Sequence, residues 1–181
     1  MRRSRASYEE ERRALIKSSG DGLASAKQAI FAFHRDDRRE GDRLLRDARM
    51  TADRLARRFR RFPALAGEGA YRAMLEEYVE AALYAAYLSG RRIGPVAVPG
   101  MDDEAYLGGL MDMTGELVRR AVAAATRRDD AEARRCHAAV EAVAGELIRM
   151  HITGSLRPKY DQTKHNLRKL EEILYDLSKR A

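Results

Sequence analysis

Two short acidic patterns are the residues in this chain whose types and spacing could do chemistry. They are EYVE at 77–80 and DMTGE at 112–116. Residues three or four apart are neighbours on a helix surface, so each pattern would present two adjacent carboxylates. Carboxylates this close repel unless a proton or cation lies between them. Oxygen-only ligands favour Mg²⁺, with Mn²⁺ as a second option, over zinc or copper. In a basic protein such a cation indicates phosphodiester cleavage.

A helical wheel places both acidic pairs away from the apolar side of their helices. Glu80 falls about 60° from Glu77, whereas the apolar stripe of that segment centres near 170°. Glu116 falls about 40° from Asp112, and its apolar stripe centres near 180°. Glu76 lies on the shoulder and is expected to be ordinary surface charge. Such spacings also occur on many charged helices, so spacing alone leaves surface charge open for all four acids.

Three glycines lie around the second acidic pair, at Gly108, Gly109 and Gly115. Glycine weakens a helix but lets another backbone or a ligand come close. The sequence therefore predicts a close approach at this face.

Other kinds of site find no support in the sequence. A di-iron bundle needs Glu three residues before His, and none of the four histidines has it. Nucleophile-elbow, phosphate-loop and dinucleotide patterns are absent from the sequence. The one cysteine, Cys136, excludes an internal disulfide and a cysteine-based metal cluster, and we expect it to be buried.

The elements that must position these acids are predicted to be helices. The chain has 181 residues, 45% hydrophobic and 35% charged, which suits one domain over residues 1–181. Apolar spacing predicts an all-α bundle of six or seven helices. Asp102 is a predicted N-cap, Pro63 should end the second helix, and the glycines of SSGDG at 18–22 allow a kink or break in the first. The predicted segments are 8–34, 37–62, 67–89, 102–126, 130–152 and about 158–179, with a loop at 90–100.

The charge distribution suggests a polyanionic partner. The net charge is +7, and six arginines follow one face of the segment 37–62. A solvated charged face and a polyanion-binding face both remain open for this stripe. We expect no membrane span, because no stretch nears ~20 apolar residues, and a cytoplasmic location, because MRRSRASYEEERR lacks the apolar segment of a secretion signal.

Four longer stretches resemble the translin family: SAKQAIFAFHR, LEEYVEAALYAAYL, YLGGLMDMTGELVRRAV and LRPKYDQTKHNLRKLEEILYDLSKR. The likeness runs over about residues 10–180, and its C-terminal part is the most specific. The family has an RNA- and single-stranded-DNA-binding translin branch and a Trax branch with the catalytic carboxylates of a Mg²⁺-dependent endoribonuclease. The Trax pattern has Glu-aromatic-Val-Glu and Asp-Leu-Thr-Gly-Glu, so all four acids here match and the chain is similar to Trax.

The resemblance implies a seven-helix all-α subunit that assembles into a closed octameric shell around short RNA. The chain lacks the long insert of eukaryotic Trax between the third and fourth helices. It therefore looks like a prokaryotic homologue, which we expect to assemble from itself. Lys164 matches a basic position used for RNA in translin, and Arg12 aligns loosely with another. A companion basic position falls on Pro158, a departure for which Arg157 and Lys159 could substitute.

These observations give a leading hypothesis and two alternatives. The leading one is a Mg²⁺-dependent endoribonuclease acting on short or single-stranded RNA. Glu77, Glu80 and Asp112 would be ligands, and Glu116 either a fourth ligand or the residue that orients the attacking water. The first alternative is a non-catalytic shell that binds RNA or single-stranded DNA and uses the carboxylates structurally. The second is a scaffold bundle with protein partners.

Overall fold

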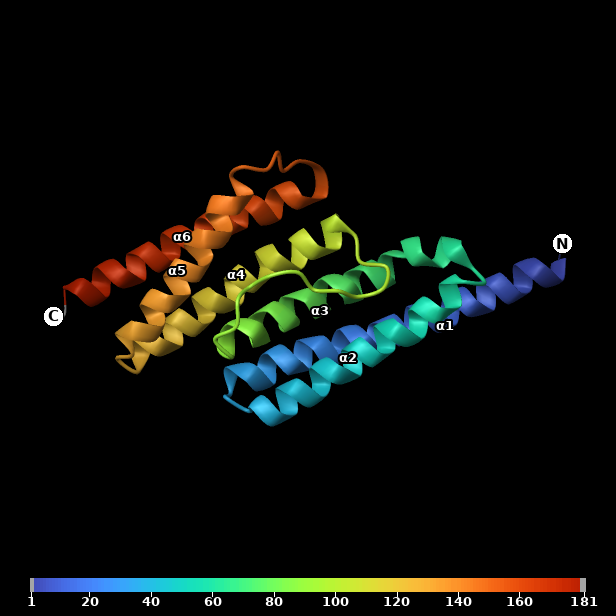
Figure 1. Ribbon diagram of the computed structural model, residues 1–181, viewed down its shortest axis with the longest axis horizontal. Coiled ribbons are helices and arrows are strands. Elements are labelled where there is room, and N and C mark those ends of the chain that lie inside the picture. Colours follow the sequence, from blue (N-terminus) through green and yellow to red (C-terminus); the bar gives the residue numbers. More distant parts are fainter. Residues whose placement is uncertain (1, 180–181) are drawn as a thin grey trace. The chain divides into compact units, whose positions relative to one another are not determined.

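Apolar residues at helical spacing form six α-helices in the computed structural model, which describes residues 2–179 (Figure 1). The α-helices are α1 (Arg2–His34), α2 (Arg38–Phe59), α3 (Gly69–Leu88), α4 (Asp103–Thr126), α5 (Asp130–Leu147) and α6 (Arg157–Ser178), with two short 3₁₀ helices, η1 (Pro63–Gly67) and η2 (Gly154–Leu156). Over these residues the prediction of an all-α chain with six or seven helices is confirmed.

The chain forms two compact units, Met1–Gly109 and Leu110–Ala181. The boundary falls inside α4, whose residues up to Gly109 belong to the first unit. The acids of EYVE therefore belong to the first unit and those of DMTGE to the second.

In the first unit, α1 packs along both α2 and α3. The break of the first helix that the glycines at 18–22 allow does not occur, because α1 continues from Arg2 to His34. Gly22 serves close packing instead, since a Cβ there would lie 2.5 Å from Met74 Sδ and 3.1 Å from a methyl of Thr51. This close contact leaves little room for a side chain at position 22, which accounts for a glycine in the helix interior.

The end of α2 differs from its prediction. We expected the helix to reach Phe62, but it ends at Phe59 and a turn follows, with the Phe62 amide donating to Arg58 O at 3.0 Å. Pro63 disfavours the α-conformation at the residue before it, and Phe62 accordingly has φ −133° and ψ 76°. Pro63 then opens η1.

The predicted loop at 90–100 is fastened to the first unit by hydrogen bonds to its carbonyl groups. Arg49 donates to Ala97 O at 2.7 Å, and Tyr71 donates to Pro99 O at 2.6 Å. Burial, and next the Asp53 carboxylate, raise the pKa of the Tyr71 hydroxyl to about 12, so it remains a donor at neutral pH. The loop is thus an ordered strap.

In the second unit, α5 packs against α6. The Asp129 side chain accepts from the Glu132 amide at 3.1 Å and caps α5. Cys136 is fully buried, as predicted. The predicted extension of α5 to Ile152 is wrong, because the helix ends at Leu147. Ile152 lies beyond the end of the helix but is buried, so it continues the apolar spacing that predicted a longer helix.

No helix among the described residues is long and apolar enough to cross a membrane.

Candidate metal and nucleic-acid site

The first acidic pair lies on α3, a helix whose surface is mostly buried. Its buried residues include Tyr78 and Val79, which stand between Glu77 and Glu80. Glu77 keeps 17% of its side chain exposed, and the Lys27 ammonium of α1 lies 3.4 Å from its carboxylate. Glu80 is also half-buried. The helical wheel placed the two acids away from the apolar stripe, and their half-burial makes them unlike a freely solvated surface pair.

Glu76 corrects the expectation of ordinary surface charge. It is half-buried, and its carboxylate lies where a Cβ on Gly108 would be. A Cβ on Gly109 would meet the Glu76 carbonyl oxygen and lie 2.9 Å from the Glu80 amide nitrogen. The predicted close approach is therefore present at Gly108 and Gly109, which let the start of α4 pack directly on the α3 turn carrying the acids. Gly115 has only one ordinary contact, 3.8 Å from Asn166 Nδ2.

The second acidic pair lies on the part of α4 that belongs to the second unit. Asp112 forms an ion pair with the Lys159 ammonium at the start of α6, and the two side chains are 33% and 30% exposed. Glu116, 22% exposed, lies 3.8 Å from an Arg119 nitrogen. Asp112 and Glu116 are thus half-buried acids with basic neighbours, as Glu77 is.

A buried polar network holds the turn between Asp112 and Glu116, and its members are not predicted from the sequence. Asn166 of α6 donates to Thr114 Oγ1 at 2.9 Å, and Thr114 donates to Met111 O at 2.6 Å. Gln162 in turn donates to Asn166 Oδ1 at 3.0 Å. Thr114 is fully buried and Asn166 nearly so. Thr and Asn within otherwise apolar stripes were the only signal of this contact.

Each of the four residues predicted to bind RNA has an acidic partner within its own unit. Arg12 donates to Glu68 at 2.6 Å, and this hydrogen bond, with the Glu68 charge, raises the pKa of the arginine. Lys159 pairs with Asp112, as described above. Arg157 and Lys164 share Asp161, at 3.2 and 2.6 Å.

Tyr160 lies between the last two cations. Its ring centroid is 5.7 Å from the Arg157 guanidinium and 4.7 Å from the Lys164 ammonium. These contacts, together with Asp161, hold both side chains at the first turns of α6. Hydrogen bonds from Lys164, and next from Arg157, lower the pKa of the exposed Asp161 carboxyl.

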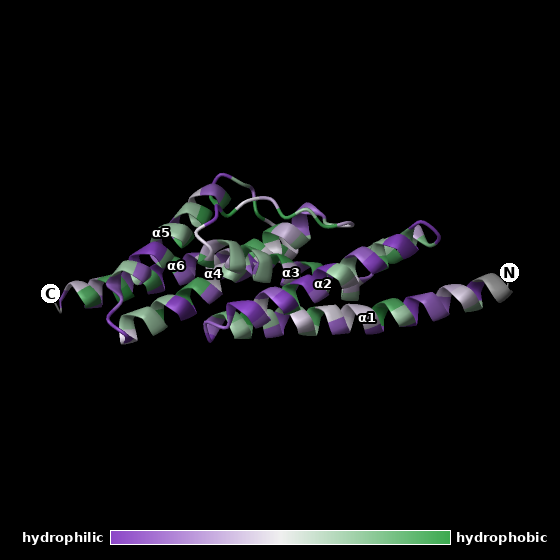
Figure 2. Cartoon of the chain, turned by 60° about the horizontal axis from the view of Figure 1, so that its bottom comes forward, coloured by the Kyte–Doolittle hydropathy of each residue, from purple (hydrophilic) through white to green (hydrophobic). Residues whose placement is uncertain are grey.

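Five of the six arginines in the predicted stripe lie on α2, and Arg61 lies in the turn that follows it. All six are exposed, and much of α2 is polar in Figure 2. The six residues are Arg39, Arg43, Arg46, Arg54, Arg57 and Arg61. Arg43 pairs with Glu40 at 2.6 Å and Asp47 at 2.7 Å. Among the described residues, Arg46, Arg54 and Arg57 form no ion pair that would neutralise them. The stripe is therefore strongly positive, and a solvated charged face and a polyanion-binding face both remain open for it.

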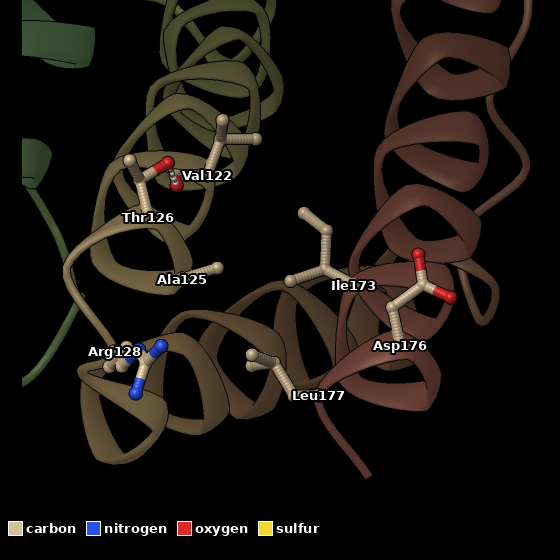
Figure 3. A pocket seen from close by; sticks show the side chains of 7 residues that line it. All are labelled: Val122, Ala125, Thr126, Arg128, Ile173, Asp176 and Leu177. Carbon is tan, nitrogen blue, oxygen red and sulfur yellow. Dashed lines mark hydrogen bonds between the residues drawn. The ribbon is translucent and has the colours of Figure 1, made fainter. Parts of the chain in front are cut away.

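A hollow of about 500 Å³ lies in the second unit, beside the C-terminal end of α4 (Figure 3). It is lined by Val122, Ala125, Thr126, Arg128, Ile173, Asp176 and Leu177. Its walls are mainly apolar, with one arginine and one aspartate at the rim. It contains none of the four predicted catalytic acids.

The donor set of the acids fits a hard divalent cation. Each of the four offers carboxylate oxygens only, and each is half-buried rather than fully solvated. Lysine ammonium groups at Glu77 and Asp112 show that positive charge is stabilised beside both pairs. Within residues 2–179, no three His, Cys, Asp or Glu side chains are grouped as a metal site.

Residues 97–181 match the translin family. The protein named Translin from Gallus gallus is 33% identical over 82 residues, which cover 45% of this chain and 36% of the relative. The matched stretch thus spans about a third of that translin's length.

Solved structures resemble the chain over nearly its whole length. The AfC3PO crystal structure gives a TM-score of 0.90 at 20% identity, covering 98% of this chain and 94% of that one. The apo-NeC3PO crystal structure gives 0.88 at 21% identity, with 97% and 94% covered. An AfC3PO complex with duplex RNA gives 0.88 at 19% identity, with 98% and 94% covered. At these identities the likeness shows a translin-type all-α fold.

Proposed function

We propose that this protein is a metal-dependent endoribonuclease of the Trax type. Glu77, Glu80, Asp112 and Glu116 would hold Mg²⁺, with Mn²⁺ as a substitute. The observation that carries the proposal is the repetition of one arrangement: two pairs of half-buried carboxylates, with a lysine beside each pair. The translin match of residues 97–181 and the C3PO-like fold support it.

The chemistry divides between the metal and the chain. Bound Mg²⁺ supplies a Lewis acid that offsets phosphate charge and acidifies a water. The carboxylates fix the cation, and Glu116, if not a ligand, accepts a hydrogen bond from the attacking water and orients it. The two glycines at the start of α4 and the Asn166–Thr114 bond keep the two acidic turns in place.

RNA is the proposed substrate, and basic side chains would hold its phosphates. Lys164, Arg157, Lys159 and Arg12 remain the proposed contacts, each exchanging an acidic partner for phosphate. The AfC3PO structure with duplex RNA shows one protein of this fold with RNA bound. Affinity should fall as salt rises, because phosphate contacts release counterions.

The assembly we propose is a homo-oligomeric shell, with an octamer as the expected size. This part of the proposal comes from the resemblance to the translin family.

Substitution of single acids tests the function. We expect Glu77→Ala or Asp112→Ala to abolish Mg²⁺-dependent cleavage of a labelled RNA while RNA binding persists. Glu146→Ala is a suitable control, because Glu146 is an acid of α5 that is 68% exposed and pairs only locally, with Arg149. Cleavage that persists in both Glu77→Ala and Asp112→Ala would show that the acids were wrongly assigned.

A second candidate is a shell that binds RNA or single-stranded DNA without cutting it. Glu77 with Lys27, Asp112 with Lys159 and Glu116 with Arg119 form charge pairs that need no metal. In this alternative the carboxylates are structural. Purified protein that binds RNA but never cuts it with Mg²⁺ or Mn²⁺ would favour it.

A further inference from the structure

One ion pair joins two residues to which different roles were assigned. Asp112 is a proposed metal ligand, and Lys159 is a proposed RNA contact, yet the Lys159 ammonium is bonded to the Asp112 carboxylate. Both residues lie in the unit Leu110–Ala181. This ion pair competes with both proposed roles, because it engages the Asp112 carboxylate and the Lys159 ammonium with each other.

The helices that carry the pair are fixed, whereas the pair itself can open. Asn166 lies two helical turns beyond Lys159 and donates to the buried Thr114, two residues after Asp112. Thr163, between them on α6, is fully buried. The register of α6 on α4 is therefore set by buried contacts, and Lys159 and Asp112 are each about one-third exposed at its edge.

We propose that Lys159 is a positioning residue that exchanges partners when the metal binds. Without a divalent cation its ammonium neutralises and orients Asp112. With Asp112 serving as a ligand of the cation, the Lys159 ammonium would leave the carboxylate and bind an RNA phosphate. This inference rests on the proposed function, since it takes Asp112 as a metal ligand.

The exchange makes metal and RNA binding interdependent. Metal binding frees a cation for RNA, so Mg²⁺ raises RNA affinity through Lys159. By linkage, RNA raises Mg²⁺ affinity by the same factor. Lysine suits this exchange because its ammonium is a point charge on a flexible stem, whereas arginine would clasp the carboxylate with two parallel bonds.

The test compares the metal affinity of the intact protein and its variants by calorimetric titration with Mg²⁺ alone. A half-exposed ion pair contributes modestly, so Lys159→Met should bind Mg²⁺ about threefold to fivefold more tightly than wild type. Lys159→Arg should bind it more weakly than wild type. Lys169→Met is the matched control, because Lys169 is an exposed α6 lysine paired with Glu172 at 3.3 Å, and it should leave Mg²⁺ affinity unchanged.

A second titration measures the affinity for a 2′-O-methyl RNA, which is resistant to cleavage, with and without Mg²⁺. The increase caused by Mg²⁺ should be present in wild type and in Lys169→Met, and lost or reduced in Lys159→Met. Unchanged or weaker Mg²⁺ binding by Lys159→Met would overturn the inference. An undiminished increase of RNA affinity on addition of Mg²⁺ in Lys159→Met would overturn it as well.

Asp112→Asn separates failure of the inference from failure of the proposed function. If Asp112→Asn binds Mg²⁺ as wild type does, the metal assignment is wrong and the inference falls with it. If Asp112→Asn loses Mg²⁺ while Lys159→Met leaves its affinity unchanged, only the inference is wrong.

Discussion

At the scale of single residues, Asp112 and Thr114 on α4 are held by Lys159 and Asn166 on α6. Spacing along a helix is local, so EYVE and DMTGE are visible in the sequence. Lys159 lies 47 residues from Asp112, and Asn166 lies 52 from Thr114, so the fold alone brings them together. The same reason explains why the sequence predicts surface charge at Glu76: its neighbour, Gly108, is on another helix.

Asp161 forms ion pairs with two of the proposed RNA contacts, Arg157 and Lys164. Its pKa is lowered from the ordinary 3.8, so its ion pairs stabilise the fold above that value and are lost as pH falls through the folded pKa. At pH 7 both pairs are therefore intact. We expect Asp161→Asn to free Arg157 and Lys164 and to raise RNA affinity at pH 7.

Filter binding over a salt series checks this. The slope of log affinity against log salt should steepen by about 0.7 for each added phosphate contact to a single strand. Glu172→Gln, which frees only Lys169 on the same helix, is the control. Unchanged affinity and slope in Asp161→Asn would remove Arg157 and Lys164 from the interface.

At the scale of elements, helix type and number followed from the apolar spacing, and the errors fall at helix ends and at glycines. The end of α2 depends on the steric restriction that Pro63 places on the Phe62 backbone, and α5 stops before a buried Ile152 that continues the apolar pattern. From the sequence alone Gly22 is expected to weaken the helix, whereas in the structure it allows close packing against Met74 and Thr51. Local propensity cannot distinguish these two uses.

Substitution of Gly109 tests whether the close approach of α4 to α3 holds the turn that carries Glu77 and Glu80. A Cβ at Gly109 would meet α3 backbone, which cannot move aside, whereas one at Gly108 would meet mainly the flexible Glu76 side chain. We expect Gly109→Ala to lower the free energy of unfolding by about 1–3 kcal/mol, and Gly108→Ala by less.

Urea unfolding measures both variants. Gly145→Ala on α5 is the control, since a Cβ there meets nothing within 4 Å, and it should raise stability by about 0.5–1 kcal/mol. If Gly109→Ala is as stable as Gly145→Ala, the two helices do not depend on this contact.

At the scale of the whole molecule, the fold is better supported than the activity. The C3PO-like fold covers nearly the whole chain, while the translin family match covers residues 97–181 and so includes DMTGE but not EYVE. The net charge of +7 and the exposed α2 arginines are consistent with a polyanionic partner. The composition could predict such a partner in general, but only a reaction can show that RNA is cut.

The most direct test is therefore cleavage by the purified wild-type protein. A labelled single-stranded RNA is incubated with the protein and Mg²⁺, and EDTA is added during the reaction. We predict that RNA is cut internally, that cutting stops on chelation, and that it resumes when Mg²⁺ is restored in excess. Protein that binds the RNA but leaves it intact with both Mg²⁺ and Mn²⁺, or cuts it equally well in EDTA, would contradict a metal-dependent endoribonuclease.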